Sequence, residues 1–281
     1  MVEYEDRIHR QVKYNNMSKE TQYVARLPDE NGHIAYPTEE HETWQALYSR
    51  QLGNLAKYAC AEYQQGLIDL GLSPNRIPQL SDIDNVLLEM TGWKTAAVPA
   101  LISFERFFQL LAHKEFPVAT FIRSKDEFDY LREPDIFHEV FGHCPLLTNR
   151  SFSKFSHAYG KLGLAASKED RVLLARLYWF TVEFGLIQKS DMSLQIYGGG
   201  ILSSPGETLY AMGKEPEIRP FNLVDVLRTP YRIDIMQPVY YAINSLDYLD
   251  EIVEMDIMSA VNQAKKLGLF APLYEPKSKV S

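Results

Sequence analysis

The stretch LYWFTVEFGL, residues 177–186, places one carboxylate, Glu183, in the middle of an apolar and aromatic run. The run has the composition of a helix that is buried on most sides, so we expect the glutamate to be buried with it. A buried charge without a partner is very costly, and Glu183 therefore needs one. Two kinds of partner meet this need: an arginine, in a salt bridge, or a metal ion.

A second segment, PDIFHEVFGHCP at residues 134–145, carries two histidines around acidic and apolar residues. His138 and His143 are five residues apart, whereas the zinc-peptidase pattern H-E-x-x-H spaces its histidines more closely. On a regular α-helix this separation turns the two side chains about 140° apart. Because Gly142 and Pro145 flank His143, we expect the helix to break there, with His138 on the helix and His143 on the turn after it.

The two histidines and Glu183 together match the facial triad, in which two imidazoles and one carboxylate hold Fe(II) and leave positions open. The same ligands also serve catalytic zinc, in which case Glu139 is the candidate general base beside His138. A structural zinc site would more often contain cysteines, and Cys144 is not favoured as a ligand although it adjoins His143. A third possibility is a protein without activity that uses the metal for stability. The spacing alone leaves these alternatives open.

The composition is typical of a globular protein that binds neither nucleic acid nor membrane. The chain has 281 residues, 46% of them hydrophobic and 23% charged, and a net charge of −8, whereas nucleic acid and anionic membranes attract basic surfaces. Its only cysteines, Cys60 and Cys144, favour a reducing compartment over a disulfide framework. The N-terminus lacks the apolar core of a signal peptide. The longer apolar stretch VLLARLYWFTVEFGLI, residues 172–187, contains Arg176 and Glu183 and is short for a membrane span. We therefore expect a cytoplasmic protein.

The spacing of apolar residues predicts many helices and few strands, in one mostly helical domain. Residues 1–20 are expected to be loosely ordered, and residues 116–123 to form a strand. Ser81, Ser103 and Ser167 are expected to cap helices. The glycine-rich stretch at residues 197–207 is expected to be a loop. Helices are expected at residues 44–70, 81–90, 104–111, 152–162, 168–183 and 245–269.

Three long segments of the chain resemble the aromatic amino acid hydroxylases, the pterin-dependent iron enzymes. These are PDIFHEVFGHCPLL, LYWFTVEFGLI and YGGGILSSPGE, and the resemblance runs in order from YPTEEHETW through IPQL to QPVYYAINS. It implies a mostly α fold of the α+β class, a single-domain helical basket with short strands around a non-haem iron site. It also implies that residues 21–281 form a catalytic domain, without the separate regulatory domain that animal members of the family carry.

The same resemblance implies roles for individual residues on the iron and substrate side. The iron ligands are implied to be His138, His143 and Glu183. Arg123 is implied to hold the carboxylate of the substrate, a task that suits a guanidinium fork. Ser203 is implied to hydrogen-bond the first iron histidine as well as to border the substrate. The remaining residues implied to shape the substrate pocket are Pro134, Trp179 and Gly200, and those implied to lie just outside the iron ligands are Asp135 and Tyr178.

On the pterin side, the resemblance implies that Phe107 stacks on the pterin ring. Leu101 and Ile102 match a loop whose backbone meets the edge of the pterin. Glu139 and Ala175 are implied to line the same pocket. The chain has Ala100 where many members of the family have glycine, a departure at the place where backbone contact with the pterin is implied.

The reaction implied is the hydroxylation of L-phenylalanine to L-tyrosine. Its cofactors are Fe(II) and tetrahydrobiopterin or a related tetrahydropterin, which reacts with O₂ and becomes 4a-hydroxytetrahydropterin. The partners implied are therefore small molecules, with the chain acting as a monomer or a dimer. Hydroxylation of tyrosine or tryptophan by the same chemistry is the nearest alternative, and a zinc hydrolase with the same three ligands is a more distant one.

Overall fold

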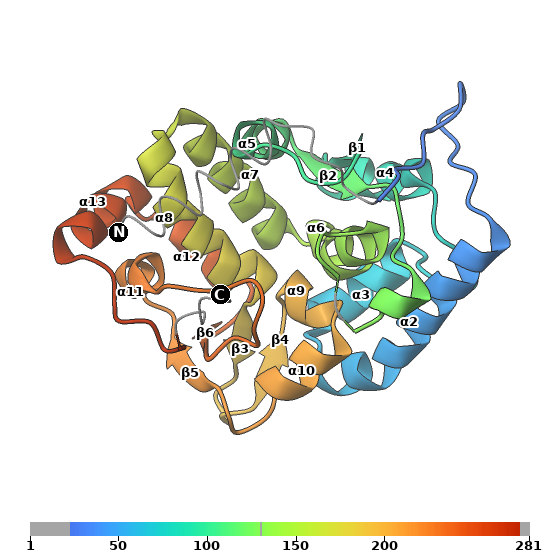
Figure 1. The fold of residues 1–281 in the computed structure, drawn as a ribbon. Coiled ribbons are helices and arrows are strands. Elements are labelled where there is room, and N and C mark those ends of the chain that lie inside the picture. The colour runs from blue at the N-terminus through green and yellow to red at the C-terminus, as the bar shows by residue number, and fades with distance from the viewer. Residues whose placement is uncertain (1–22, 130, 276–281) are drawn as a thin grey trace, which may run out of the picture.

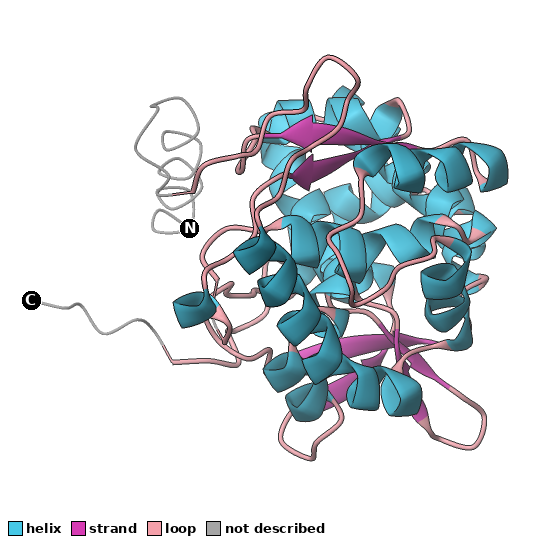
Figure 2. Cartoon of the chain, turned by 90° about the vertical axis from the view of Figure 1, so that its right-hand side faces the viewer, coloured by secondary structure: helices cyan, strands magenta, loops and turns pink. Residues whose placement is uncertain are grey.

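The computed structural model describes residues 23–129 and 131–275, so the segment at residues 1–20 that is expected to be loose lies outside the described part. Helices make up most of the molecule (Figure 1). Figure 2 places two small sheets at opposite ends of the molecule with helices between them. The mostly helical α+β class predicted from the sequence is confirmed.

The helices fall into long ones that carry apolar faces and short ones that connect them. The α-helices are α2 (Thr38–Tyr58), α3 (Ala61–Asp69), α4 (Leu80–Met90), α5 (Phe104–Ala112), α6 (Cys144–Leu147), α7 (Arg150–Ala165), α8 (Lys168–Tyr178), α9 (Gly199–Leu202), α10 (Pro205–Ala211), α11 (Leu223–Arg228), α12 (Tyr248–Glu254) and α13 (Ile257–Leu267). A short 3₁₀-helix and two π-helices complete the set: η1 (Lys125–Glu127), η2 (Phe137–His143) and η3 (Trp179–Glu183).

The strands form two sheets. A parallel pair joins β1 (Lys94–Val98) to β2 (Glu115–Ala119), with Lys94 opposite Glu115 and Val98 opposite Ala119. A mixed sheet has the order β4-β3-β6-β5, and only its β3–β4 pair is antiparallel. Its members are β3 (Leu186–Gln188), β4 (Leu194–Ile196), β5 (Glu217–Pro220) and β6 (Val239–Ile243).

The apolar core fills the space between the sheets, and η2 runs through it. Phe137 and Phe141, both on η2, are fully buried and stack on each other with ring centroids 4.5 Å apart. Trp44 of α2 meets the Phe137 ring edge-on at 5.3 Å. Burying rings of this size contributes about 2 to 3 kcal/mol each. The segment that carries both histidines is therefore held by fully buried aromatic rings from η2 and α2.

Helix α5 is held close to α7 by a glycine. A β-carbon added at Gly163 of α7 would lie 2.0 Å from the Phe108 ring of α5, so no larger residue fits without moving one of the helices. Phe107, the residue before Phe108 on α5, meets the ring of Tyr178 with ring centroids 5.2 Å apart. The α5–α7 contact thus sets the place of an aromatic side chain that points toward the end of α8.

The caps predicted at Ser103 and Ser167 are confirmed, whereas the cap predicted at Ser81 and several element boundaries are wrong. Helix α4 begins at Leu80, one residue before Ser81, and Gln79 occupies its N-cap position. Ser103 and Ser167 each accept a hydrogen bond from a backbone N–H of the helix that follows. The helix predicted at residues 44–70 is divided into α2 and α3, because the Cys60 amide donates to the Ile196 carbonyl of β4 instead of continuing the helix. The last predicted helix is divided into α12 and α13, since Asp256 caps a new helix by accepting from Ser259.

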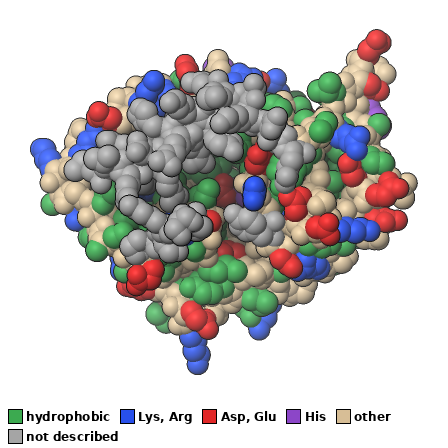
Figure 3. All heavy atoms as spheres, viewed as in Figure 1, with side chains coloured by type: hydrophobic (Ala, Val, Ile, Leu, Met, Phe, Trp, Pro, Cys, Tyr) green, Lys and Arg blue, Asp and Glu red, His purple; other side chains and the backbone are tan. Residues whose placement is uncertain are grey.

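Two further local predictions differ from the structure. The strand predicted at residues 116–123 ends at Ala119, and the chain then turns toward η1. The glycine-rich stretch predicted to be a loop contains the short helix α9, which begins at Gly199. Among the described residues, none of the helices has the length and apolarity needed to cross a bilayer. Acidic and basic side chains are interspersed on the face drawn in Figure 3.

Candidate active site

Both segments singled out in the sequence are π-helical. In a π-helix each N–H bonds to the carbonyl five residues earlier, so side chains five residues apart lie nearly above one another. The Cys144 amide donates to the Glu139 carbonyl at the end of η2, and the Phe184 amide donates to the Trp179 carbonyl at 2.9 Å at the end of η3. The predicted break between His138 and His143 is therefore wrong: a continuous π-helix brings them to the same face.

Contacts from other segments accompany the widened turns of η2. Tyr63 of α3 donates its hydroxyl to the Phe141 carbonyl at 2.7 Å. At the other end, the carboxylate of Asp135 accepts a hydrogen bond from the His138 amide at 3.0 Å. Tyr63 comes from another helix and Asp135 lies just before η2, so one tertiary and one local contact accompany the π-helical form.

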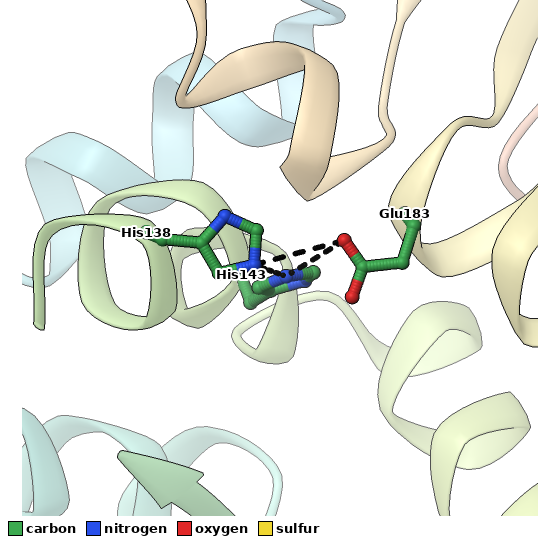
Figure 4. Close-up of side chains that lie close together, drawn as sticks. All are labelled: His138, His143 and Glu183. Carbon is green, nitrogen blue, oxygen red and sulfur yellow. Dashed lines mark hydrogen bonds and ion pairs between the residues drawn. The ribbon is translucent and has the colours of Figure 1, made fainter. Parts of the chain in front are cut away.

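Three potential metal ligands converge where η2 meets η3. His138 and His143 reach in from η2 and Glu183 from η3, and the side chains point toward one another (Figure 4). The two Nε2 atoms are 3.2 Å apart, and Oε2 of Glu183 lies 3.7 Å from Nε2 of His138 and 3.4 Å from that of His143. The donor atoms all lie within 4.8 Å of one another. Three lone-pair donors facing one point fit a metal ion with three protein ligands and open positions on its other side.

Ser203 orients one of these imidazoles. Its hydroxyl donates to the Gly199 carbonyl at 2.8 Å and also lies 2.9 Å from Nδ1 of His138. With its one hydrogen used on the carbonyl, the hydroxyl can only accept from the ring, which places a proton on Nδ1 of His138. The lone pair of Nε2 is then left to face His143 and Glu183, the tautomer that a metal ligand needs.

The charge states of the three side chains also suit a cation. Burial lowers the pKa of His138 to about 4, so this imidazole is neutral near pH 7. Burial alone would raise the pKa of Glu183, but His143 and His138 outweigh it, and the pKa lies below its usual value. The site therefore offers an ionised carboxylate together with a neutral imidazole. Burial raises the pKa of the neighbouring Glu139 well above its usual range, with Glu183 and Asp135 adding to the shift.

The glycine-rich stretch lets its backbone lie directly against these ligands. A β-carbon at Gly199 would lie 2.4 Å from Nδ1 and Cε1 of His143, and one at Gly198 would lie 2.4 Å from the Glu183 carbonyl. At Gly200 a β-carbon would lie 3.0 Å from Oε2 of Glu183 and 3.1 Å from the Phe184 ring. Glycine is required here because no side chain fits between α9 and the ligands.

Arg123 and Asp135 form a buried pair beside η2. Nε and Nη2 of the arginine donate to the two carboxylate oxygens at 2.8 and 2.9 Å, and the Arg123 amide donates to the same carboxylate. Burial opposes ionisation of Asp135, but Arg123 outweighs it and holds the pKa of the carboxyl below its usual value. Since Asp135 also accepts from the His138 amide, it connects the arginine to the histidine helix. Pro134, one residue earlier, is half-buried.

The aromatic residues around η3 form a layer next to Glu183. Trp179 lies 4.4 Å from the Phe184 ring and stacks on Tyr231 at 4.3 Å. Tyr178, the last residue of α8, contacts Phe107 at 5.2 Å and Tyr159 at 5.3 Å. Trp179 and Tyr178 are neighbours in the sequence, but their rings pack against two different groups of aromatic residues.

The residues predicted for the pterin side are less closely gathered. Phe107 is half-buried against Tyr178, and Ala175 is half-buried on α8. Ile102 is half-buried and Leu101 is 42% exposed, both in the loop before α5. Ala100, at the position where the sequence departs from the family, is buried against Ala119 and Phe121.

Sequence reasoning missed several side chains that complete the site. Tyr231 and Gln237 contact the Trp179 indole, and Glu207 contacts Gln237. Gly199 was not singled out from its two neighbours, although it lies against His143. Gln237 belongs to the QPVYYAINS segment that carries part of the resemblance, and a lone polar residue before an apolar strand was the only signal available.

Comparison with known proteins gives one family. The family model described as biopterin-dependent aromatic amino acid hydroxylase matches residues 3–266. A phenylalanine-4-hydroxylase of Pseudomonas aeruginosa is 58% identical over 259 residues, which cover 92% of this chain and 98% of that protein.

Solved structures agree in fold along nearly the whole chain. The apo structure of the cold-active phenylalanine hydroxylase from Colwellia psychrerythraea matches with a TM-score of 0.87 and 57% identity, over 89% of this chain and 97% of that one. Phenylalanine hydroxylase from Chromobacterium violaceum with bound iron(III) and 7,8-dihydrobiopterin matches with a TM-score of 0.81 and 37% identity, over 95% of this chain and 96% of that one.

Proposed function

Because the chain belongs to the biopterin-dependent aromatic amino acid hydroxylases, we propose which of its residues carry out the hydroxylation of L-phenylalanine to L-tyrosine. The reaction uses O₂, Fe(II) and a tetrahydropterin. The observation that carries the assignment is the convergence of His138, His143 and Glu183 within 4.8 Å. We assign these three side chains as the ligands of Fe(II).

When bound, Fe(II) and the tetrahydropterin supply the electrons that activate O₂ for attack on an aromatic ring. The contribution of the chain is to hold and orient its ligands and to keep water out. Ser203 keeps the proton of His138 on Nδ1, so that Nε2 is free to bind the metal. The backbone of Gly199 excludes water from one side of the His143 ring. Asp135 and Tyr178 act from just outside the ligands, through the His138 amide and the Phe107 ring respectively.

Arg123 is the residue we assign to the carboxylate of the substrate. Asp135 accepts from two of its five N–H groups, on Nε and Nη2. The remaining N–H groups, on Nη1 and Nη2, form a second edge that can donate two parallel hydrogen bonds to a carboxylate. The pair with Asp135 supports this role, because it fixes a side chain that would otherwise be flexible. Pro134, Trp179, Gly200 and Ser203 are assigned to the pocket for the aromatic ring.

The pterin is assigned to the side of the site where α5 meets α8. Phe107 offers a ring for stacking, and its contact with Tyr178 supports a place next to η3. Leu101 and Ile102 of the preceding loop, Glu139 of η2 and Ala175 of α8 are assigned to the same pocket. A protonated Glu139 carboxyl can donate a hydrogen bond as well as accept one.

The proposal extends to the setting in which the chain works. The large apolar core supports treating residues 21–281 as one catalytic domain. Two buried free cysteines, Cys60 and Cys144, support a cytoplasmic location. We assign the chain a monomeric or dimeric state.

The test is turnover by the metal-stripped protein after reloading with Fe(II) or with Zn²⁺. We expect tyrosine to form from phenylalanine only with Fe(II) and tetrahydrobiopterin, and kcat/KM for phenylalanine to exceed that for tyrosine and tryptophan. A preference for tyrosine or tryptophan would move the substrate assignment within the family. Hydrolase activity with Zn²⁺ and no tyrosine with Fe(II) would contradict the proposal.

A further inference from the structure

The indole of Trp179 is held on its edge as well as on its faces. Its rings lie against Phe184 on one side and Tyr231 on another, at 4.4 and 4.3 Å. The indole N–H donates to Oε1 of Gln237 at 3.0 Å. Stacking on flat rings resists tilting, but a half-turn of the indole about its Cβ–Cγ bond presents equally flat faces to both neighbours. Only the hydrogen bond distinguishes one edge of the indole from the other.

The side chain of Gln237 has one possible orientation. Its Nε2 group donates to the carbonyls of Arg232 and Ile235, both at 2.9 Å. Carbonyl oxygens only accept, so the amide cannot be reversed, and Oε1 must face the indole. Gln237 is 1% exposed. A reversed or absent amide would leave buried polar groups without partners, which costs about 1 to 3 kcal/mol for each group.

The carboxylate of Glu207 binds the backbone of Gln237. The backbone N–H of Gln237 donates to Oε1 of Glu207 at 3.3 Å, and the Tyr240 hydroxyl donates to the same oxygen. Glu207 is buried on α10, directly after the segment that carries Ser203. A chain of hydrogen bonds therefore joins the Trp179 indole to the helix next to the histidine contact.

From these contacts we propose that Gln237 is a positioning residue for the aromatic pocket. It sets the rotation of the Trp179 indole and so contributes to the choice among aromatic substrates. The inference rests on the proposed role of Trp179 in the substrate pocket. The Phe184 ring lies against the indole and also lies 3.1 Å from the place that a β-carbon at Gly200 would take. A turned indole therefore acts on a ring that borders Gly200 and changes the wall that an aromatic substrate meets. Misfits of about one methylene in apolar pockets change kcat/KM about tenfold or more.

A double-mutant cycle on the Fe(II)-loaded protein tests the proposal. Gln237→Met keeps the length of the side chain and removes the acceptor, and Trp179→Phe keeps a ring and removes the indole N–H. We expect Gln237→Met to lower the ratio of kcat/KM for phenylalanine to that for tyrosine by about fivefold, the effect of one net hydrogen bond. It should also lower the amount of tyrosine formed per pterin oxidised. In the Trp179→Phe background, Gln237→Met should leave both quantities nearly unchanged.

Gln51→Met is the matched control. Gln51 is also a fully buried amide and donates to the Leu202 carbonyl at 2.6 Å, but it does not contact Trp179. This variant should lose stability and keep the substrate ratio. Equal effects of Gln237→Met in both backgrounds, or an effect no larger than that of Gln51→Met, would overturn the proposal.

Two results separate this inference from the proposed function. If Trp179→Phe leaves the substrate ratio unchanged, the pocket role of Trp179 is wrong and the inference fails with it. If Trp179→Phe changes the ratio and Gln237→Met does not, only the role of Gln237 is wrong.

Should Gln237→Met fail to fold, the unaltered protein still provides a test. The indole N–H of Trp179, assigned in NMR spectra by its loss in Trp179→Phe, should exchange slowly with deuterium. Exchange as fast as that of a free indole would overturn the proposal.

Discussion

The two halves of the proposed active site, the iron side and the pterin side, are built differently. On the iron side, the ligands lie on π-helices within the core, with glycine backbone against His143 and a serine that orients His138. On the pterin side, Phe107 is half-buried and Leu101 is 42% exposed in a loop. The proposed iron site is therefore part of the packing that holds the fold, whereas the proposed pterin side includes partly exposed residues of α5 and its loop. Changes on the first side should act on metal binding, and changes on the second should act on pterin binding.

The largest effect is expected from Glu183→Ala. The variant removes the only carboxylate among the three converging ligands. Removing a residue that only hydrogen-bonds a metal ligand lowers activity about 10- to 100-fold, so losing the ligand itself should lower activity by more than about 100-fold. Iron content, measured by metal analysis after reloading, should fall in parallel.

Glu139→Gln is the matched control for that change, because Glu139 is a carboxylate next to His138 on η2 but is not among the converging ligands. It should keep its iron. Tight iron binding by Glu183→Ala would contradict the assignment of the three ligands.

A β-carbon at position 199 tests whether the backbone contact is part of the iron site. Gly199→Ala must displace either α9 or the His143 ring, since the new carbon would lie 2.4 Å from the ring. We expect Fe(II) affinity to fall about 10- to 100-fold, as measured by competition with a chelator. Gly53→Ala, on α2 with open space around it, should leave the affinity unchanged and add about 0.5 to 1 kcal/mol of stability. Equal iron affinity in the two variants would show that α9 does not constrain the ligands.

Ser203→Ala should have a smaller effect on the same quantity. Without the hydroxyl, the proton on Nδ1 of His138 loses its acceptor, and we expect about a tenfold loss of Fe(II) affinity. Ser204 is the neighbouring control: it caps α10 by accepting from the Glu207 amide. Ser204→Ala should therefore cost about 1 kcal/mol of stability and retain the affinity for iron. An iron affinity equally reduced in both variants would mean that Ser203 acts only by stabilising the local fold.

The smallest effect is expected from Phe107→Leu. Losing the ring that we assign to stacking on the pterin removes about 0.5 to 1.5 kcal/mol, so KM for tetrahydrobiopterin should rise about two- to tenfold. Iron content should not change, because Phe107 does not contact a ligand. Phe104→Leu, three residues earlier on α5 and 37% exposed, should leave KM near its original value. A loss of iron in Phe107→Leu would contradict the claim that changes on the pterin side act on pterin binding alone.

The sequence predicted the parts of the molecule that depend on short-range patterns. The serine caps of α5 and α8 and the general helical class were confirmed because capping and apolar spacing act within a few residues. The division of α2 from α3 was missed because it depends on the Ile196 carbonyl, which belongs to a distant strand.

The site shows the same limit. Motifs drew attention to His138, His143 and Glu183, but the reason for the spacing of the histidines lay in a π-helix that is accompanied by contacts such as the Tyr63 hydroxyl on the Phe141 carbonyl. No local pattern distinguishes that helix from an α-helix with a break. Gln237 was missed because its importance comes from three partners that only the folded chain brings to it.

X-ray absorption at the iron K edge of the Fe(II)-loaded protein tests the central claim most directly. The spectrum reports which atoms bind the metal. With His138, His143 and Glu183 as the ligands, it should fit two imidazoles, with oxygen at every other position and no sulfur, and His143→Ala should remove one imidazole. A sulfur ligand from Cys144, a third imidazole, or a spectrum that His143→Ala does not change would contradict the claim.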